Sequence, residues 1–203
     1  MIIVYGSSLA PSVRKVLAVI AEKGLAAEHR PLAPHDPSPK FKETSPFGHI
    51  PGFRDGPFTL SDSSAICHYL ERRYPEPALV PSSATDYGRM VWFDQFADRF
   101  LGTAECKVVM NRVVKKLRGE PLDPDAVEQA LTRDLPPLLD YLETEVNGAF
   151  LVGDALSLAD LAVACPFASL AIADYVPDVR RWPRLHAYLG RILDRPSLSS
   201  IRN

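Results

Sequence analysis

Two short stretches of the chain combine residue types that can hold a small peptide-like ligand. The first, Ser45-Pro46-Phe47-Gly48-His49-Ile50-Pro51, is a loop that runs into a β-rich segment. An X-Pro bond at this place suits a cis peptide, because that isomer costs only about 0.5–1 kcal/mol. A cis bond before Pro51 would turn the N–H and C=O of Ile50 outward, where an extended peptide pairs with them as an added strand. The alternative is an ordinary lead-in to a hairpin, since proline is common where strands begin.

The second stretch, Leu60-Ser61-Asp62-Ser63-Ser64-Ala65-Ile66, ends a β-rich run and opens a helical pattern. The first N–H groups of a helix are unpaired and carry the positive end of its dipole, so a ligand carboxylate fits there. Ser63 would add a hydroxyl donor to that carboxylate, and Asp62 an acceptor for a neighbouring ammonium group. An amino-acid head group carries both charges. The alternative is that the two residues only cap the helix, as Ser and Asp commonly do.

A small α/β domain is predicted around these stretches. Strand and helix patterns alternate first, then two strands form a hairpin and a helix closes the domain. The expected elements are a strand at Met1–Tyr5, a helix at Pro11–Lys23, a short strand after Gly24, a loop at His35–Lys42, strands around Ile50–Phe53 and Phe58–Leu60 joined by the turn Arg54–Pro57, and a helix at Asp62–Tyr74.

The rest of the chain shows only helical spacing. Prolines and serines between Pro75 and Ser83 indicate a linker. The helices expected beyond it cover Asp86–Leu117, Asp125–Val146 with a bend at Pro136-Pro137, a segment from Leu158, and Pro183–Leu193. The sequence therefore predicts an α/β domain at residues 1–76, a linker at 77–85 and an all-helical domain at 86–203.

Composition narrows the possible partners. The chain has 203 residues and a formal net charge of −2, from 23 Lys and Arg against 25 Asp and Glu, with no long block of either sign. Nucleic acid and membrane surfaces are therefore poor partners. Apolar runs are far shorter than the roughly 20 residues of a membrane helix, and no signal-peptide pattern opens the chain, so we expect a soluble, cytoplasmic protein. Cys67, Cys106 and Cys165 are widely spaced among apolar residues and are expected to be buried, and no metal site is visible.

Together the two stretches resemble the glutathione site of the soluble glutathione transferases. Members of that family carry a Pro-x-Gly-x-x-Pro loop followed by a Leu-x-Glu-Ser-x-Ala-Ile helix start, and here Asp62 stands where glutamate or glutamine is usual. The resemblance also covers Val4–Val16 and extends over essentially the whole chain. It implies an α/β thioredoxin-like N-terminal domain followed by an all-α C-terminal domain.

The resemblance also implies a ligand and its contacts. Glutathione would be the co-substrate, with Ile50 and Pro51 holding its cysteinyl main chain and Asp62 and Ser63 its γ-glutamyl end. His49 would reach the glycyl end, although an exposed loop side chain is an equally plain interpretation of that residue.

The catalytic assignment departs from the family pattern. Glutathione chemistry needs a thiolate, whereas a free thiol has a pKa near 8.5. In phi- and tau-like members a serine or cysteine just before the first helix lowers that pKa, but here Ala10 occupies the position. The remaining pair Ser7 and Ser8 resembles that of the zeta class and is predicted to be catalytic. Tyr5, expected in the core or an interface, and Ser12, expected on the first helical turn, rank lower, and backbone N–H groups near Ala10 are a further alternative.

The second domain carries a motif with a structural meaning. Phe150–Gly153 followed by Leu156-Ser157-Leu-Ala-Asp160 is similar to the capping box and buried aspartate of the family. Ser157 and Asp160 would bond to each other's backbone N–H at a helix start.

The predicted function follows from the resemblance. We expect a transferase that joins the glutathione thiolate to a hydrophobic electrophile in detoxification, with the electrophile between the domains near Trp92, Phe96, Phe100 and Met110, which at helical spacing are otherwise core residues. The alternatives are a non-catalytic protein of the same fold and a glutathione-dependent isomerase or peroxidase. A homodimer is expected because the family usually forms two-fold dimers.

Overall fold

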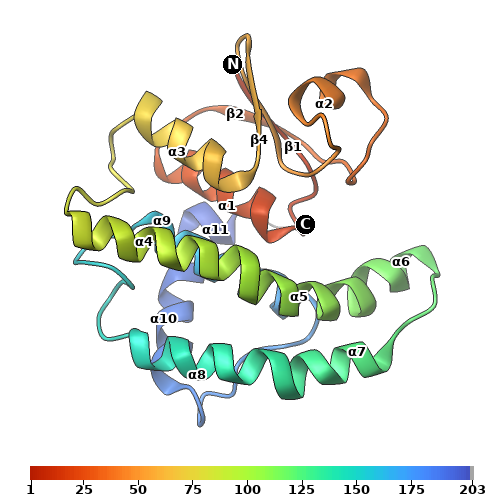
Figure 1. The fold of residues 1–203 in the computed structure, drawn as a ribbon, viewed down its shortest axis with the longest axis vertical. Helices are drawn as coiled ribbons and strands as arrows, with labels where there is room; N and C mark the ends of the chain where they lie inside the picture. The colour runs from red at the N-terminus through yellow and green to blue at the C-terminus, as the bar shows by residue number, and fades with distance from the viewer. Residues whose placement is uncertain (202–203) are drawn as a thin grey trace. The chain divides into compact units, whose positions relative to one another are not determined.

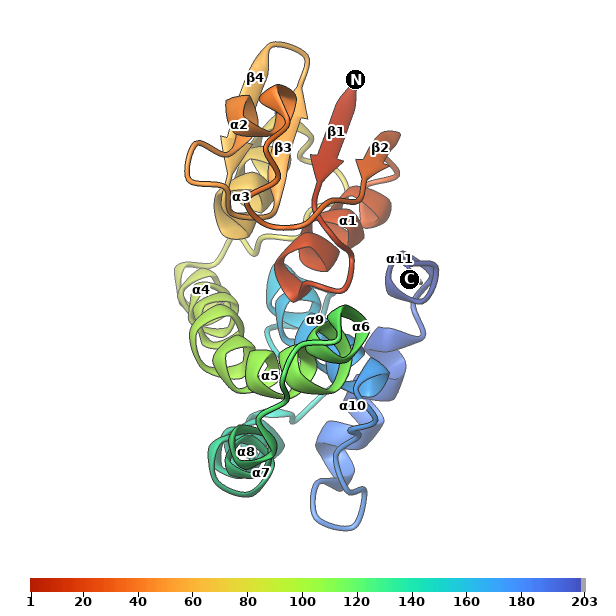
Figure 2. The same ribbon diagram turned by 90° about the vertical axis from the view of Figure 1, so that its right-hand side faces the viewer.

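The structure is a computed structural model that describes residues 1–201, and it divides into two compact units. Among the described residues, the first unit comprises Met1–Val80 together with residues 195–201, and the second comprises Pro81–Asp194. Figures 1 and 2 show the elements of each unit.

A four-stranded mixed sheet forms the centre of the first unit. Its order is β2-β1-β3-β4, where β1 (Ile2–Tyr5) pairs in parallel with β2 (Ala27–Arg30) and antiparallel with β3 (Gly52–Asp55). The β3 strand pairs antiparallel with β4 (Phe58–Ser61), which is the predicted hairpin. All four residues of β1 are buried, as a central strand covered on both faces requires.

Three helices complete this α/β layer. As Figure 1 shows, α1 (Pro11–Glu22) and α3 (Ser63–Arg73) lie on one face of the sheet, while α2 (Pro39–Thr44) lies on the other. The apolar side chains of α1 at helical spacing, such as Val13, Val16 and Ile20, are buried against the unit's core. This arrangement confirms the predicted α/β fold of the N-terminal part.

Two short helices were not predicted. The segment His35–Lys42 was expected to be a loop, but α2 begins at Pro39 and is anchored by the fully buried Phe41. The second, α11 (Pro196–Ser199), packs against α1 within the first unit. Both start with proline at the first helical position, where its missing N–H costs nothing.

A carboxylate from α1 holds the end of the chain. Glu22 accepts hydrogen bonds from Arg195 Nε at 2.7 Å, from Arg195 Nη2 at 2.9 Å and from Ser197 Oγ at 2.5 Å. The Arg195 bonds outweigh burial and hold the pKa of Glu22 below its usual value. Arg195 and Ser197 therefore contact α1, while the domain bounds predicted from the sequence stay a prediction.

The second unit is all-helical within the described residues. One run without a break comprises α4 (Ala84–Phe96), η1 (Ala97–Leu101), α5 (Gly102–Val109), η2 (Met110–Lys115) and α6 (Lys116–Arg118), where η marks π-helical turns. A second run comprises α7 (Pro124–Gln129), η3 (Ala130–Asp134) and α8 (Leu135–Glu145). The η3 turn ends two positions before Pro136, and Pro136 and Pro137 lie in the first turn of α8. Since prolines lack the N–H of the regular helix, a local change of winding there is the expected response to the pair.

The helix α9 (Leu158–Ile172) is the core of this unit. Nearly all of its residues are buried, and it packs against α4, α5 and α10 (Pro183–Leu193). A helix that is apolar on every side belongs in the middle of a bundle. Within residues 1–201, no helix combines the length and hydropathy needed to cross a membrane.

One prediction about cysteines is wrong. Cys67 and Cys165 are buried as expected, but Cys106 is exposed on α5. The neighbouring Glu105 is buried, because adjacent residues of a helix point in different directions. The apolar residues around Cys106 in the sequence therefore do not show which way it points.

Candidate functional site

The loop before β3 presents the backbone of Ile50. The Ile50–Pro51 bond is cis, and the Ile50 carbonyl accepts a hydrogen bond from Ser12 Oγ at 3.3 Å. Among residues 1–201, the Ile50 N–H has no acceptor. The half-buried Ile50 therefore offers a backbone donor, and a carbonyl with a second lone pair, at the end of a strand.

The preceding loop is fixed by hydrogen bonds of its own. Ser45 Oγ donates to the His49 carbonyl at 2.7 Å, and the His35 N–H donates to the Gly48 carbonyl at 2.8 Å. The rings of His35 and His49 lie 5.9 Å apart, and both side chains are exposed. His49 therefore lies beside the Ile50 backbone, as the sequence order requires, and its side chain faces solvent.

Gly6 allows the first loop to approach Ile50. Its φ is +135°, and a Cβ atom there would lie 2.7 Å from Val13 Cγ2 and 2.9 Å from Ile50 Cβ. Only glycine combines that backbone conformation with so close a contact. The loop after β1, the first turn of α1 and the Ile50 turn are thus packed together.

The start of α3 gathers the second set of predicted residues. Asp62 is the N-cap residue, and its Oδ1 accepts from the Ala65 N–H at 2.9 Å. Its φ of +80° is uncommon for any residue but glycine, and such strained positions cluster at functional sites. Ser63 is the first helical residue and is only 4% exposed. Asp62 therefore serves as a cap, which was the alternative interpretation, while its second carboxylate oxygen stays available.

The loop before α1 contains the predicted catalytic pair. Ser7 Oγ accepts from the Leu9 N–H at 3.3 Å, and the Ser7 carbonyl accepts from the Ala10 N–H at 3.1 Å, so Ser7 stabilises the turn. Ser8 follows in the same half-buried turn. Ala10 is the N-cap of α1 and gives that helix no side-chain cap. Tyr5 is buried in the sheet, as expected.

Comparison with known proteins identifies the family. Residues 4–78 match the family model described as the glutathione S-transferase N-terminal domain, and residues 103–196 match the glutathione S-transferase C-terminal domain. A glutathione S-transferase from Hyoscyamus muticus is 30% identical over 96% of this chain and 94% of its own. The chain belongs to the glutathione S-transferase family. The prediction of this family from the sequence is confirmed.

Two further relatives support the fold of this glutathione S-transferase family member. A zeta-class glutathione S-transferase from Euphorbia esula is 30% identical over 81% of this chain and 74% of its own. The crystal structure of a glutathione S-transferase from Rhodospirillum rubrum F11 superposes with a TM-score of 0.89 at 26% identity, covering 98% of this chain and 90% of the other. The predicted fold class, a thioredoxin-like domain followed by a helical domain, is confirmed.

In this transferase, the capping motif of the second unit is closed by hydrogen bonds. Asp160 Oδ2 accepts from the Ser157 N–H at 2.8 Å and from Ser157 Oγ at 3.1 Å. Its Oδ1 accepts from the Leu151 N–H at 2.8 Å and from the Tyr188 hydroxyl at 3.0 Å. Burial raises the pKa of Asp160, and these four donors oppose that rise. The carboxylate holds α9, α10 and the preceding loop together, a structural role.

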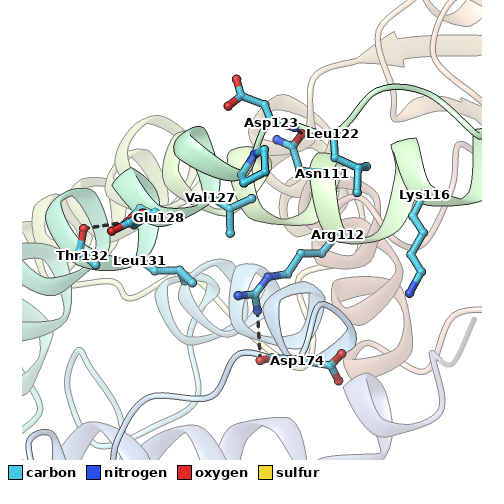
Figure 3. Close-up of a pocket in the computed structure, with 11 residues that line it drawn as sticks. Asn111, Arg112, Lys116, Leu122, Asp123, Val127, Glu128, Leu131, Thr132 and Asp174 are labelled. Atoms are coloured by element: carbon cyan, nitrogen blue, oxygen red, sulfur yellow. Dashed lines mark hydrogen bonds between the residues drawn. The ribbon is translucent and has the colours of Figure 1, made fainter.

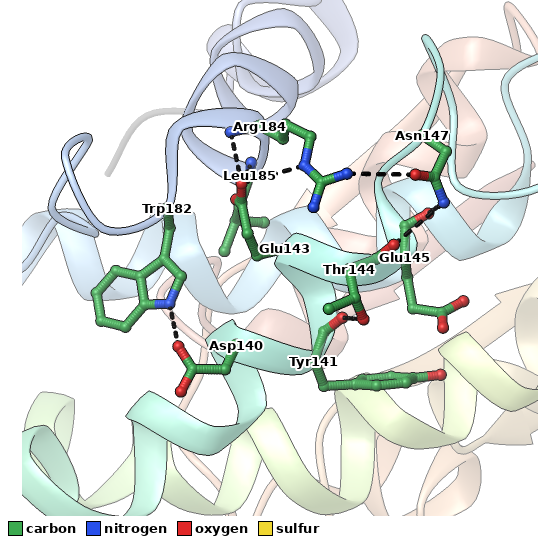
Figure 4. A network of polar contacts seen from close by, with 9 residues as sticks. All are labelled: Asp140, Tyr141, Glu143, Thr144, Glu145, Asn147, Trp182, Arg184 and Leu185. Atoms are coloured by element: carbon green, nitrogen blue, oxygen red, sulfur yellow. Dashed lines mark hydrogen bonds and ion pairs between the residues drawn. The ribbon is translucent and has the colours of Figure 1, made fainter.

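A second carboxylate network joins α8 to α10, as Figure 4 shows. Glu143 accepts from the Arg184 N–H at 3.1 Å and from the Leu185 N–H at 2.8 Å, so it caps the first turn of α10 from another helix. Burial would raise the pKa of Glu143, but the Leu185 and Arg184 amides and the Arg184 guanidinium outweigh it and lower that pKa. Asp140 accepts from Trp182 Nε1 at 2.7 Å nearby.

The residues expected near the electrophile differ in their surroundings. Phe96 is buried, whereas Trp92 and Phe100 are each about half exposed. Trp92 donates through Nε1 to the Tyr141 hydroxyl at 2.7 Å. Met110 opens the η2 turn and is partly buried. The role of these four residues toward an electrophile stays a prediction.

A cavity of about 690 Å³ lies elsewhere in the second unit (Figure 3). It lies beside η2 and α7, and the Arg112 side chain reaches across it to the Ala173 and Asp174 carbonyls at 3.0 and 3.3 Å. Val127 and Leu131 line it from α7 and η3. Among the described residues, no group of three or more His, Cys, Asp or Glu side chains is placed to bind a metal ion.

Proposed function

We propose that this chain is a glutathione transferase that joins the glutathione thiolate to a hydrophobic electrophile. The observation that carries the proposal is that one compact unit presents both an Ile50 backbone suited to an extended peptide and the N-terminus of α3 suited to an amino-acid head group. Glutathione contains both chemical parts. The relatives' names, glutathione S-transferase, point the same way.

The proposed binding uses few contacts. The cysteinyl N–H and C=O of glutathione pair with the Ile50 C=O and N–H as an added strand beside Pro51. The γ-glutamyl carboxylate meets the hydroxyl and the N–H of Ser63 at the start of α3, and its ammonium group meets Asp62. His49 borders the glycyl end.

The proposed reaction is nucleophilic attack by sulfur. The bound thiol releases its proton to solvent, and the thiolate attacks an electrophilic carbon. In substitution the new C–S bond replaces the bond to a leaving group, which departs with its electron pair. In addition a proton from solvent completes the product. The protein contributes by stabilising the thiolate and holding it in place.

A second function deserves a test because of one observation. Ala10, at the usual place of the catalytic side chain, gives α1 no cap and offers sulfur no hydroxyl. A non-catalytic protein that binds glutathione or a partner is therefore the main alternative. Isomerase or peroxidase chemistry, which the pair Ser7 and Ser8 favours, would use the same bound thiolate.

Further properties belong to the same proposal. We propose a cytoplasmic homodimer that acts in detoxification, with domains at residues 1–76 and 86–203 joined by the linker at 77–85. Exposed aromatic side chains are consistent with a covered face in an assembly, since Phe47 is 81% and Phe58 41% exposed.

Calorimetric titration of glutathione into the wild type and Ser63→Ala is the test. Loss of a hydrogen bond to a carboxylate costs about 1.5–3 kcal/mol, so the Kd should rise about 10- to 100-fold. Ser64→Ala is the matched control, because Ser64 lies in the same turn and its hydroxyl accepts from Lys15 Nζ at 3.2 Å. A conjugation assay on the forms that bind then separates an enzyme from a binding protein. Absence of wild-type binding would contradict the glutathione assignment.

A further inference from the structure

The first turn of α1 lacks the hydroxyl or thiol side chain that would normally stabilise the glutathione thiolate. Ala10, the N-cap residue, has no hydroxyl, and Pro11, the next residue, has no N–H. Ser12 is therefore the first residue of α1 that carries any hydrogen-bond donor. It carries two, because its N–H lies in the first turn, where no intrahelical acceptor exists, and its side chain is a hydroxyl.

The Ser12 side chain already points at the proposed ligand position. Its Oγ donates to the Ile50 carbonyl at 3.3 Å, across 38 positions of sequence. That carbonyl is the proposed acceptor for the cysteinyl N–H of glutathione. Within a cysteinyl residue only Cα and Cβ separate the sulfur from the amide nitrogen, so a ligand bound at Ile50 brings its sulfur close to Ser12.

We propose that Ser12 is the catalytic hydroxyl of this transferase, donating its hydrogen bond to the glutathione sulfur. This inference rests on the proposed function. Without ligand, the Ser12 hydroxyl donates to the Ile50 carbonyl. When glutathione binds, the cysteinyl N–H takes that acceptor, and the Ser12 hydroxyl turns to the thiolate. The exchange leaves the Ile50 carbonyl paired at each stage, which avoids the cost of an unpaired acceptor.

The position of Ser12 adds an electrostatic contribution. The N-terminus of a helix carries about half a positive charge, and the Ser12 N–H is part of it. A thiolate there meets both donors of one residue together with the dipole of α1, a helix of 12 residues. Ser12 remains protonated throughout, because it acts as a donor and the thiol proton leaves to solvent.

The alternative serine is held differently. Ser7 Oγ accepts the Leu9 N–H, and the Ser7 carbonyl accepts the Ala10 N–H, so Ser7 is bound within its own turn. Neither contact joins it to the Ile50 carbonyl. Ser7 therefore shapes the loop, whereas Ser12 links α1 to the backbone that would hold glutathione.

The test measures the pKa of bound glutathione by the ultraviolet absorbance of its thiolate across pH. In Ser12→Ala the thiol pKa should rise by about one to two pH units, the effect of losing one hydrogen bond to an anion. The acid limb of kcat/KM for conjugation should shift by the same amount. Ser12→Thr, which keeps a hydroxyl, should stay close to the wild type, and Ser7→Ala is the comparison variant.

A binding control separates this role from a merely structural one. S-methylglutathione has no ionisable thiol, so Ser12→Ala should bind it within about threefold of the wild type, a change of about 0.7 kcal/mol or less. The assignment to Ser12 is overturned if Ser12→Ala leaves the acid limb of kcat/KM unshifted while the wild type binds glutathione. It is also overturned if Ser7→Ala shifts that limb and Ser12→Ala does not. In both cases the transferase proposal stands. A shift in Ser12→Thr as large as in Ser12→Ala also overturns it. Failure of the wild type to bind glutathione overturns both proposals.

Discussion

Asp62 shows how folding and binding can compete for one side chain. Asp62 is the N-cap of α3 and has a φ of +80°, and its Oδ1 accepts a hydrogen bond from the Ala65 N–H. With ψ of 123°, the Asp62 backbone lies outside the left-handed helical region and is strained, and its short carboxylate bonds locally to the Ala65 N–H. A carboxylate one methylene shorter than the usual glutamate therefore fits both the cap and the proposed ammonium contact.

Two substitutions at Asp62 should separate these roles. Asp62→Asn keeps a good cap and has nearly the same side-chain shape as Asp, so backbone strain is unchanged and the free energy of unfolding should stay within about 0.5 kcal/mol of wild type. Its Kd for glutathione should rise about fivefold, as expected for an exposed ion pair. Asp62→Ala should weaken binding similarly and also lower stability by about 1 kcal/mol. Chemical denaturation and calorimetry measure the two effects, and unchanged glutathione binding by Asp62→Asn would contradict the ammonium contact.

The residues proposed to bind glutathione lie in contiguous motifs. The Ile50–Pro51 turn and the Asp62–Ser63 helix start each occur within seven consecutive residues, so their local geometry follows from residue type. Ser12 ranks low from the sequence alone, because its contact with Ile50 depends on how β1, α1 and β3 pack. One signal was available: with Ala10 and Pro11 before it, Ser12 is the first donor of the helix.

At the scale of elements, long periodic patterns were predictable and short or irregular ones were not. α1, α3 and the β3–β4 hairpin have clear periods or turn residues and were placed within a few residues. α2 and α11 have six and four residues, too few to show a helical period. No proline marks the π-helical turns η1 and η2, so the sequence pattern does not predict them.

Capping between helices is an element-scale feature that sequence reading does not find. Glu143 on α8 satisfies two first-turn N–H groups of α10, whose own N-cap, Trp182, provides no side-chain acceptor. At pH 7, Glu143→Gln should lower the free energy of unfolding by about 1–2 kcal/mol, because a charged cap becomes a neutral one that also presents N–H groups. Glu145→Gln on the same helix is the control, since it loses only a partly exposed pair with Arg89, worth about 0–1 kcal/mol.

The effect of Glu143→Gln should depend on pH in a defined direction. The folded state lowers the pKa of Glu143, so the carboxylate's contribution is complete above the unfolded pKa of about 4.3 and is lost as the pH falls through the lowered value. The stability difference between wild type and variant should therefore be constant from pH 7 to about 5 and shrink below about 4. Denaturation midpoints across this range measure it, and a difference that grows on acidification would contradict the capping role.

At the scale of the whole molecule, the two units differ in the element that forms their core. The first is built around a sheet and also binds Arg195 and Ser197 through Glu22, whereas the second is organised around the buried helix α9. The return of Arg195 and Ser197 to α1 is a long-range contact that a linear division at 77–85 does not anticipate. Each unit also exposes large apolar side chains, such as Phe47 in the first and Leu117 in the second.

Phe47 is the side chain whose exposure best tests the proposed homodimer. It is 81% exposed in the loop that leads to Ile50, and Leu117, the middle residue of α6, is 82% exposed. In a two-fold dimer each interface residue is used twice, so burying a Phe worth about 1.5–3 kcal/mol makes a large contribution. Phe47→Ser should raise the dimer dissociation constant by at least about tenfold, while Leu117→Ser should leave it unchanged. Sedimentation velocity over a concentration series measures both variants. A wild type that stays monomeric at high concentration would contradict the dimer, and equal effects of the two substitutions would show that Phe47 has no special place in the interface.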